Sequence, residues 1–276
     1  MKKVFVWGVM AVAFAGLLAG CGGARGKSLT IKGSDTMVIL GQRWAEEYMK
    51  KNPGVTLQVT GGGSGTGISA LINGGTDICQ ASRPMKDEEK KMAEDKNHKP
   101  VKEIRVALDG IAVYVNEKNP VKNIASDTLA RIYRGEITSW KDLGGAKSKI
   151  VAYGRENNSG TYVFFKEHIL KNKDYAADIQ SLPGTAAIVN AVAQDANAIG
   201  YGGVGYAKGI SELTVDGIAP TMENVVGQKY PISRALYFYT IGEPEGDAKA
   251  FIDWVLSPEG QAICKEVGYY PLPQTH

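Results

Sequence analysis

The chain has 276 residues, of which 43% are hydrophobic and 22% are charged. These are globular values, so a wholly disordered chain is excluded, and the length allows one large domain or two ordinary ones. The 32 basic and 29 acidic residues leave a net charge of +3, too balanced for a nucleic-acid-binding surface. The histidines lie far apart and three cysteines are too few for a disulfide scaffold or a zinc ribbon, so we expect no metal, cofactor or nucleic-acid partner.

The N-terminus has the pattern of an export signal. Met1 to Lys3 precede an uncharged apolar run, Val4 to Leu18, which is shorter than the roughly 20 residues of a membrane-spanning helix and matches a signal-peptide core. Leu18-Ala19-Gly20-Cys21 resembles the bacterial lipobox, whose cysteine is lipidated and becomes the first mature residue. A buried helix is the alternative, but the glycines after Cys21 are typical of a flexible tether. We expect a signal peptide at 1–20, a tether at 21–27, and a lipid-anchored protein exported to the periplasm or cell surface.

With Cys21 expected to carry a lipid, Cys79 and Cys264 are the pair left for a disulfide. An oxidising compartment would allow a disulfide between them, whereas free cysteine is among the most buried residue types. The sequence leaves both possibilities open and slightly favours two buried thiols.

Segments after residue 28 alternate between strand-like and helical patterns, which predicts an α/β fold. In chain order, strands are expected at 29–31 and 55–60, separated by a helix with one apolar stripe. The stripe consists of Met37, Leu40, Trp44 and Tyr48. The later expected elements are a helix at 87–95, a strand at 104–115, a helix starting near Ser126, a strand at 149–153, a helix at 162–170, a strand at 234–241, and helices at 247–256 and up to Val267.

Two strand-like runs are long enough to pass between two lobes. They are Val106–Val115 and Arg234–Ile241. With these as crossings, the sequence predicts a discontinuous lobe I formed by 28–109 and 232–276, and a lobe II formed by 110–231.

Three segments place hydroxyl groups and glycines between a strand and a helix. They are Gly33-Ser34-Asp35-Thr36, Gly61 to Gly67, and Ser159-Gly160-Thr161. Helix N-termini have unpaired N–H groups and a partial positive charge, and glycine lets the backbone approach a ligand closely. Each segment alone could be an ordinary helix cap. Three in one chain predict a single shared oxyanion site.

These segments resemble the PstS-type phosphate-binding proteins, the periplasmic substrate-binding lipoproteins of the phosphate ABC transporter. Further segments extend the resemblance over almost the whole mature chain. They are Thr76-Asp77-Ile78, Ala81-Ser82-Arg83, Arg155, Ile132 to Gly135 with Trp140, Leu143-Gly144-Gly145, Ser257 to Gln261, and Gly268-Tyr269. The resemblance implies a type II two-lobe periplasmic-binding-protein fold, in which each lobe is a mixed β-sheet flanked by helices and the ligand lies in the cleft.

The resemblance also implies a set of phosphate-binding residues. They are Ser34, Thr36, Ser64, Asp77, Arg155, Ser159, Gly160 and Thr161, with Asp35, Gly65, Ser82 and Arg83 as second-rank candidates. Hydroxyls and N–H groups would donate to the dehydrated anion, and Arg155 would add a planar, charged fork. Asn157 stands where an acidic residue often accompanies the arginine in this family, so the partner of Arg155 stays open.

Asp77 is expected to select phosphate over sulfate. Phosphate keeps a proton at neutral pH and can donate it to a carboxylate, whereas fully ionised sulfate would meet Asp77 as a second acceptor. The alternative is that Asp77 only forms a turn after Gly74-Gly75.

We therefore expect a monomeric receptor that binds inorganic phosphate and delivers it to the permease subunits of an ABC importer. It is not expected to be an enzyme, because no nucleophile with a neighbouring base is evident. Gly200 to Gly205 matches G-x-G-x-x-G but lacks the long helix and the acidic residue of a dinucleotide site, so a strand-to-turn segment is expected there. A phosphate-sensing or adhesion lipoprotein with the same site, or a receptor for another tetrahedral oxyanion, remains an alternative.

Overall fold

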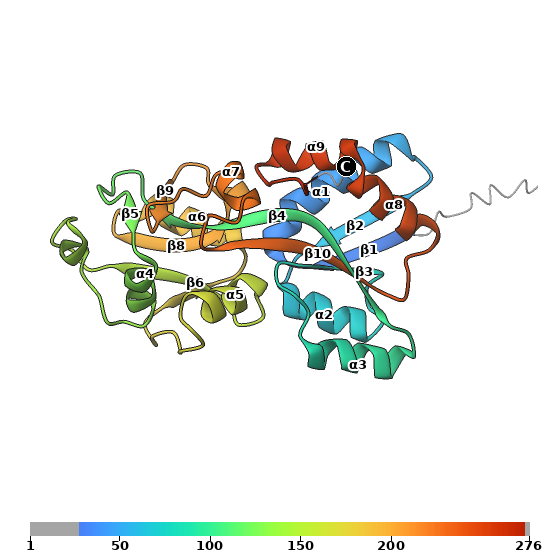
Figure 1. The fold of residues 1–276 in the computed structure, drawn as a ribbon, viewed down its shortest axis with the longest axis horizontal. Helices are drawn as coiled ribbons and strands as arrows, with labels where there is room; N and C mark the ends of the chain where they lie inside the picture. Colours follow the sequence, from blue (N-terminus) through green and yellow to red (C-terminus); the bar gives the residue numbers. More distant parts are fainter. Residues whose placement is uncertain (1–27, 274–276) are drawn as a thin grey trace, which may run out of the picture.

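The computed structural model describes residues 28–273, which form two lobes of helices and strands connected by two long strands (Figure 1). The order of the strands is β2-β1-β3-β10-β4-β8-β6-β7, and β9 pairs with β4 and β5. The expected signal peptide at 1–20, the tether at 21–27 and the lipidated Cys21 lie outside the described residues.

Lobe I is built from both ends of the described chain. Its elements are β1 (Ser28–Gly33), η1 (Asp35–Met37), α1 (Val38–Lys51), β2 (Thr56–Thr60), α2 (Ser64–Ile72), β3 (Ile78–Ala81), α3 (Asp87–Asn97), the first part of β4 (Val101–Val115), β10 (Ser233–Ile241), α8 (Gly246–Leu256) and α9 (Pro258–Val267). Strand β1 is parallel to β2 and β3, whereas β10 is antiparallel to β3 and β4. Helices α1, α8 and α9 cover one face of this sheet, and α2 and α3 cover the other (Figure 1).

The apolar stripe predicted from helical spacing faces the core of lobe I, as Met37, Leu40, Trp44 and Tyr48 are all buried. The Trp44 ring packs edge-on against Phe238 of β10, with 5.8 Å between ring centroids. Its indole N–H donates to the Gly260 carbonyl at 2.7 Å. These contacts join the N-terminal helix to the C-terminal part of the chain.

Lobe II consists of the middle of the chain. Its elements are the end of β4, β5 (Asn123–Ile124), α4 (Ser126–Tyr133), η2 (Trp140–Leu143), β6 (Val151–Arg155), α5 (Gly160–His168), β7 (Gln180–Leu182), α6 (Thr185–Gln194), β8 (Ala198–Gly203), η3 (Val204–Tyr206), β9 (Ser211–Val215) and α7 (Met222–Val226). The glycine-rich run Gly200 to Gly205 ends β8 and enters η3, which confirms the strand-to-turn interpretation. Strands β7 and β9 and helices α6 and α7 were not predicted.

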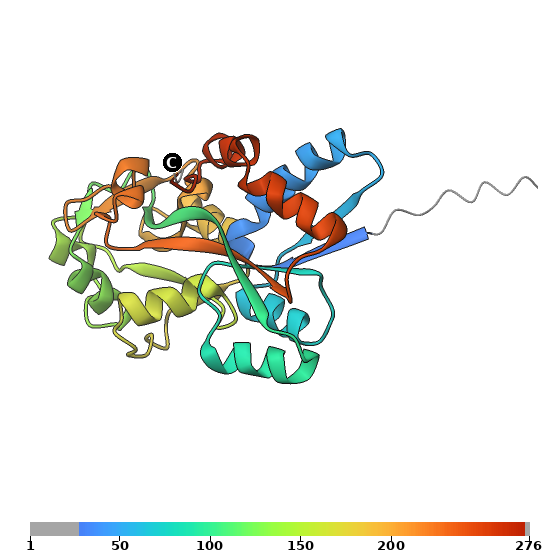
Figure 2. The ribbon, with the colours of Figure 1, turned by 45° about the vertical axis from the view of Figure 1, so that its right-hand side comes forward.

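Strand β4 belongs to both lobes (Figure 2). Its residues up to Gly110 pair with β10, and those from Ile111 onward pair with β8. Buried residues on the two sides of this change of partner, such as Val106 and Val113, pack in different hydrophobic clusters. The predicted boundaries, 28–109 with 232–276 and 110–231, stay a prediction that agrees with this change of partner.

Cys79 and Cys264 are buried free thiols. Cys79 packs among residues of α2 and α3, whereas Cys264 packs among residues of α1, α8 and α9 on the other face of the sheet. Burial raises the pKa of both thiols, that of Cys264 to about 12. The favoured sequence interpretation is therefore confirmed, and the disulfide alternative is wrong.

Candidate functional site

The three strand-to-helix segments meet where the lobes touch. The Thr36 and Thr161 side-chain oxygens lie 2.9 Å apart. The Ser34 hydroxyl donates to the Ser82 oxygen at 2.8 Å, and the Ser82 and Ser64 oxygens are 3.3 Å apart. We call these five buried side chains, Ser34, Thr36, Ser64, Ser82 and Thr161, the hydroxyl cluster.

Each part of the hydroxyl cluster follows a strand. Ser34 and Thr36 follow β1, Ser64 opens α2 after β2, and Thr161 lies in the first turn of α5 after β6. The carboxyl ends of parallel strands are where open α/β sheets bind ligands. The first segment departs from the prediction in one detail, because Asp35 and Thr36 lie in the short 3-10 helix η1 and α1 begins at Val38.

Ser159 and Gly160 bring the start of α5 against lobe I. Ser159 caps the helix by accepting from the Tyr162 N–H at 3.4 Å. A Cβ at Gly160 would lie 2.3 Å from the Ser64 hydroxyl oxygen and 2.8 Å from that of Ser82. Only glycine allows this close approach, so its place in the predicted site has a steric cause.

Asn158 forms hydrogen bonds with the glycine-rich loop Gly61 to Gly67. The sequence analysis did not identify this residue. Its side-chain amide donates to the Gly62 carbonyl at 3.0 Å and to the Thr66 hydroxyl at 3.1 Å. Its own carbonyl accepts from the Gly65 N–H at 2.9 Å. Gly65, a second-rank candidate, therefore uses its N–H in the contact between the lobes.

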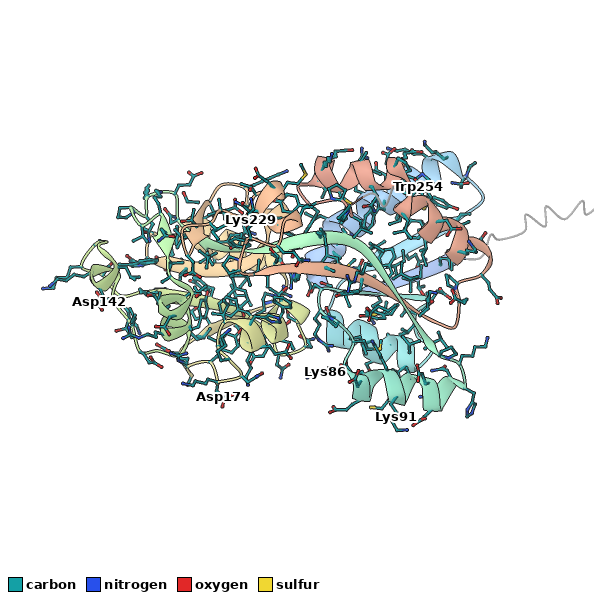
Figure 3. All side chains as sticks on the ribbon, viewed as in Figure 1. Lys86, Lys91, Asp142, Asp174, Lys229 and Trp254 are labelled. Carbon is teal, nitrogen blue, oxygen red and sulfur yellow. The ribbon has the colours of Figure 1, made fainter. Side chains whose placement is uncertain are left out.

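Arg155 is the buried cation of the site. It ends β6 and is 1% exposed, in contrast to charged side chains such as Lys91 and Asp174, which extend from the outer surfaces (Figure 3). Its two Nη atoms donate to the Asp35 carboxylate at 2.6 Å and the Thr185 hydroxyl at 2.9 Å. Among residues 28–273, its buried Nε has no hydrogen-bond partner.

Asp35 is the partner of Arg155 that the sequence left open. One carboxylate oxygen binds the arginine, and the other accepts from the Gly62 N–H at 2.7 Å. The Tyr206 hydroxyl donates to the Asp35 carbonyl at 2.8 Å. Burial raises the pKa of Tyr206 to about 12.

The prediction that Asp77 lies with the hydroxyl cluster is wrong. Its carboxylate is exposed and accepts from the Thr30 N–H at 2.7 Å and the Thr30 hydroxyl at 2.9 Å. Asp77 precedes β3, whereas Ser82 follows it. Because β3 is parallel to β1, Asp77 lies at the amino end of these strands, and the cluster lies at the carboxyl end. The alternative role in local turn structure agrees with these contacts.

Arg83 turns toward α3, although Ser82 faces the cluster as expected. Its guanidinium forms a bidentate pair with Glu89, at 2.7 and 2.8 Å, and also donates to the Pro84 carbonyl. Burial opposes ionisation of Glu89, but hydrogen bonds from Arg83 and the Lys86 N–H hold the pKa of its carboxyl below the usual value. The structure therefore does not bring Arg83 together with Arg155.

Thr185 was also missed, although a signal for it exists. It opens α6 after Pro183-Gly184, the same order of glycine, hydroxyl residue and helix as in Gly160-Thr161. Its hydroxyl accepts a hydrogen bond from one Nη atom of Arg155 and so helps to orient the guanidinium.

No cluster of three or more metal-ligating His, Cys, Asp or Glu side chains occurs in the part of the chain from 28 to 273. Within the same part, no helix is long and apolar enough to span a membrane.

Comparison with known proteins gives a family match over most of the chain. A model of the PBP superfamily domain matches residues 22–259. The phosphate-binding protein PstS of Pseudomonas aeruginosa is 34% identical over 270 residues, covering 89% of this chain and 83% of that protein. The protein of the same name from Bacillus subtilis is 36% identical over 248 residues, with 89% and 81% covered.

Solved structures match as well. A substrate-binding protein of a phosphate ABC transporter from Clostridium perfringens, solved with bound phosphate, has a TM-score of 0.84 and 34% identity, covering 90% of this chain and 100% of that chain. An ABC-type phosphate transport receptor from Vibrio cholerae has a TM-score of 0.72 and 28% identity, with 89% and 100% covered. These matches confirm the two-lobe fold implied by the resemblance.

Proposed function

This chain belongs to the PstS phosphate-binding proteins of the PBP superfamily, and we propose that it binds inorganic phosphate at the hydroxyl cluster and delivers it to an ABC importer. The proposed ligands are Ser34, Thr36, Ser64, Arg155, Ser159, Gly160 and Thr161, with Ser82 and Asp35. Asp77 is no longer among them.

The observation that carries this proposal is the state of Arg155. Asp35 and Thr185 hold its two Nη atoms, while its Nε is buried without a partner among residues 28–273. A buried unpaired donor on a charged group is costly. A phosphate oxygen accepting from Nε would remove that cost and use the rigid fork that the neighbours have already oriented.

The hydroxyl cluster supplies further donors from both lobes. Each hydroxyl has one hydrogen to donate and can also accept, so the Thr36–Thr161 pair can redirect a hydrogen to an oxyanion between the lobes. The first turn of α5 adds N–H groups without intrahelical partners and a partial positive charge. A tetrahedral anion with several acceptor oxygens suits this donor set.

We assign to Asp35 the selective role that the sequence analysis gave to Asp77. Each carboxylate oxygen of Asp35 carries one hydrogen bond, from Arg155 or from Gly62, and an ionised carboxylate has about four acceptor sites. A protonated phosphate oxygen can therefore donate a hydrogen bond to one of the free acceptor sites of Asp35. Fully ionised sulfate has no hydrogen to donate and would face a second acceptor.

We propose export, lipid attachment at Cys21, a monomeric receptor and binding without catalysis. The relatives are named as binding proteins and transport receptors, which supports a receptor over a phosphohydrolase.

The test is a calorimetric titration of the chain from Gly22 onward with phosphate, sulfate and molybdate. We expect one phosphate per chain, much weaker sulfate binding, and no hydrolysis of an aryl phosphate ester by the same preparation. Equal or tighter binding of sulfate or molybdate would assign the site to another oxyanion. Loss of cellular phosphate uptake on deletion of the gene would separate delivery to an importer from sensing or adhesion.

A further inference from the structure

A buried ion pair lies between the two crossing strands, directly behind the hydroxyl cluster. Arg234 of β10 is the register partner of Asp109 of β4. Its Nε and Nη2 donate to one Asp109 carboxylate oxygen at 2.8 and 2.7 Å. The two side chains are 1% and 0% exposed. The pair is therefore removed from solvent and its charges cancel.

The remaining donors of Arg234 point to the hydroxyl cluster. Its Nη1 donates to the Ser82 carbonyl at 3.0 Å, and its Nη2 lies 3.5 Å from the Thr36 hydroxyl oxygen. Thr36 is also held through its carbonyl, which accepts from the Tyr269 hydroxyl at 2.5 Å. One guanidinium thus contacts two members of the hydroxyl cluster, Ser82 after β3 and Thr36 after β1.

The same ion pair reaches lobe II. The second carboxylate oxygen of Asp109 accepts from the Val204 N–H, just after β8, at 3.2 Å. The guanidinium carbon of Arg234 lies 5.8 Å from the centroid of the Phe164 ring, on the helix that begins with Gly160. The space is tight, because a Cβ at Gly203 would lie 2.8 Å from the Thr36 methyl carbon and 3.1 Å from the Asp109 carboxylate.

Stability alone is a weak reason for such a pair. Exchanging a buried ion pair for apolar side chains of similar volume is often neutral or stabilising. What apolar side chains cannot reproduce is the set of donors to Ser82 and Thr36. A lysine could not replace Arg234, because its single ammonium lacks the planar fork that contacts Asp109 and the two cluster residues at the same time.

We propose that Arg234, held by Asp109, is a positioning residue for phosphate. It orients Ser82 and Thr36 and, through Asp109 and Phe164, contacts lobe II. It therefore acts on how long phosphate is retained. Since the pair is neutral, this effect is independent of long-range attraction for the anion. The inference rests on the phosphate-binding function proposed above.

The experiment replaces both members of the pair so that neither charge is left buried alone. The double variant Asp109→Asn with Arg234→Gln keeps a hydrogen-bonding pair between the strands but removes the fork. We expect its phosphate Kd to rise about tenfold, as for the loss of one or two hydrogen bonds. This rise should come from a faster koff, while kon stays within about threefold of the wild-type value. The size of the rise should be the same at low and high salt.

The matched control is another Arg–carboxylate pair of lobe I, Arg83 with Glu89, whose side chains are 6% and 22% exposed. The double variant Arg83→Gln with Glu89→Gln should keep the wild-type Kd. If the Asn/Gln pair at 109 and 234 does not fold, Asp109→Leu with Arg234→Met repeats the test with an apolar pair.

The possible outcomes are distinct. A folded variant with wild-type Kd overturns the positioning role, and so does a loss confined to kon that fades with salt, which would indicate charge attraction. A change only in the fraction of active protein, with Kd unchanged, would leave Arg234 a purely structural residue and also overturn the inference. Wild-type protein that does not bind phosphate in the same experiment overturns the proposed function instead.

Discussion

The hydroxyl oxygens of Thr36 and Thr161 lie 2.9 Å apart although 125 positions separate these residues in the sequence. Thr36 belongs to lobe I and Thr161 to the first turn of α5 in lobe II. A ligand that accepts a hydrogen bond from each would tie the two lobes together. The contact between the lobes and the occupancy of the site are therefore linked.

Phosphate should stabilise the folded chain through this link. A ligand that binds only the native protein stabilises it by about 4 kcal/mol at roughly a thousand times Kd. We expect the melting temperature in differential scanning calorimetry to rise with phosphate concentration and to change much less with sulfate. A melting temperature that is indifferent to millimolar phosphate would contradict the proposal.

Thr161→Val should weaken phosphate binding while leaving the fold intact. The change removes one buried donor to a charged ligand, worth about 1.5–3 kcal/mol, or roughly a 10- to 100-fold rise in Kd. Titration calorimetry measures the effect, and Thr56→Val, on an exposed position of β2, is the control. Equal Kd values for the two variants would remove Thr161 from the ligand set.

Asp35→Asn should lower the ratio of phosphate to sulfate affinity, because the amide no longer repels a fully ionised anion. Asp77→Asn should leave this ratio unchanged, since Asp77 binds Thr30 at the other end of the strands. Arg155→Ala should weaken the binding of both anions by about 2–5 kcal/mol. The ratio is measured for all three variants at one ionic strength. A change in Asp77→Asn without one in Asp35→Asn would reverse the assignment.

The Arg83–Glu89 pair should make the free energy of unfolding depend on pH in the acid range. The folded-state pKa of Glu89 is lowered, so its contribution is complete above the ordinary carboxyl pKa of about 4.3 and is lost as the pH falls through the folded-state pKa. Glu89→Gln should reduce the free energy of unfolding by about 1–3 kcal/mol at pH 7. The difference from wild type should shrink below pH 4 in denaturant titrations. A difference that stays constant with pH would mean that ionisation of Glu89 does not contribute.

Cys21→Ser should release the protein from membranes without affecting phosphate binding. The variant lacks the thiol that would carry the lipid, while the proposed ligands all lie in the folded lobes. Fractionation after a high-salt wash gives the distribution, and titration of the soluble fraction gives the Kd. Recovery of Cys21→Ser in the membrane pellet would refute lipid anchoring at this position.

Much of the site could be predicted because residues that are consecutive in the sequence supply its hydrogen-bond donors. Ser159-Gly160-Thr161 combines a capping hydroxyl with a glycine that allows close approach, and the structure brings it against Ser64 and Ser82. Asp77 could not be placed in the same way. Whether a residue beside a short strand lies at its amino or carboxyl end depends on where the strand begins, and β3 begins at Ile78.

Other residues depend on register between distant strands. Asp109 and Arg234 meet because β4 and β10 pair antiparallel at those positions, and no local pattern specifies this pairing. The partner of Arg155 was left open for the same reason. Asp35 is far from it in the sequence, and only the fold brings its carboxylate to 2.6 Å.

The continuous path of β4 limits how the molecule can move. Its ladder with β10 ends at Gly110 and its ladder with β8 begins at Ile111, whose N–H still donates to the Ile232 carbonyl just before β10 at 2.9 Å. We expect the torsion angles that absorb a rotation of one lobe against the other to lie in the few residues near this change of partner. Such a hinge permits bending and twisting about one narrow line but no independent tumbling. The ligand-bound arrangement of the lobes is then reached through bending and twisting at this line alone.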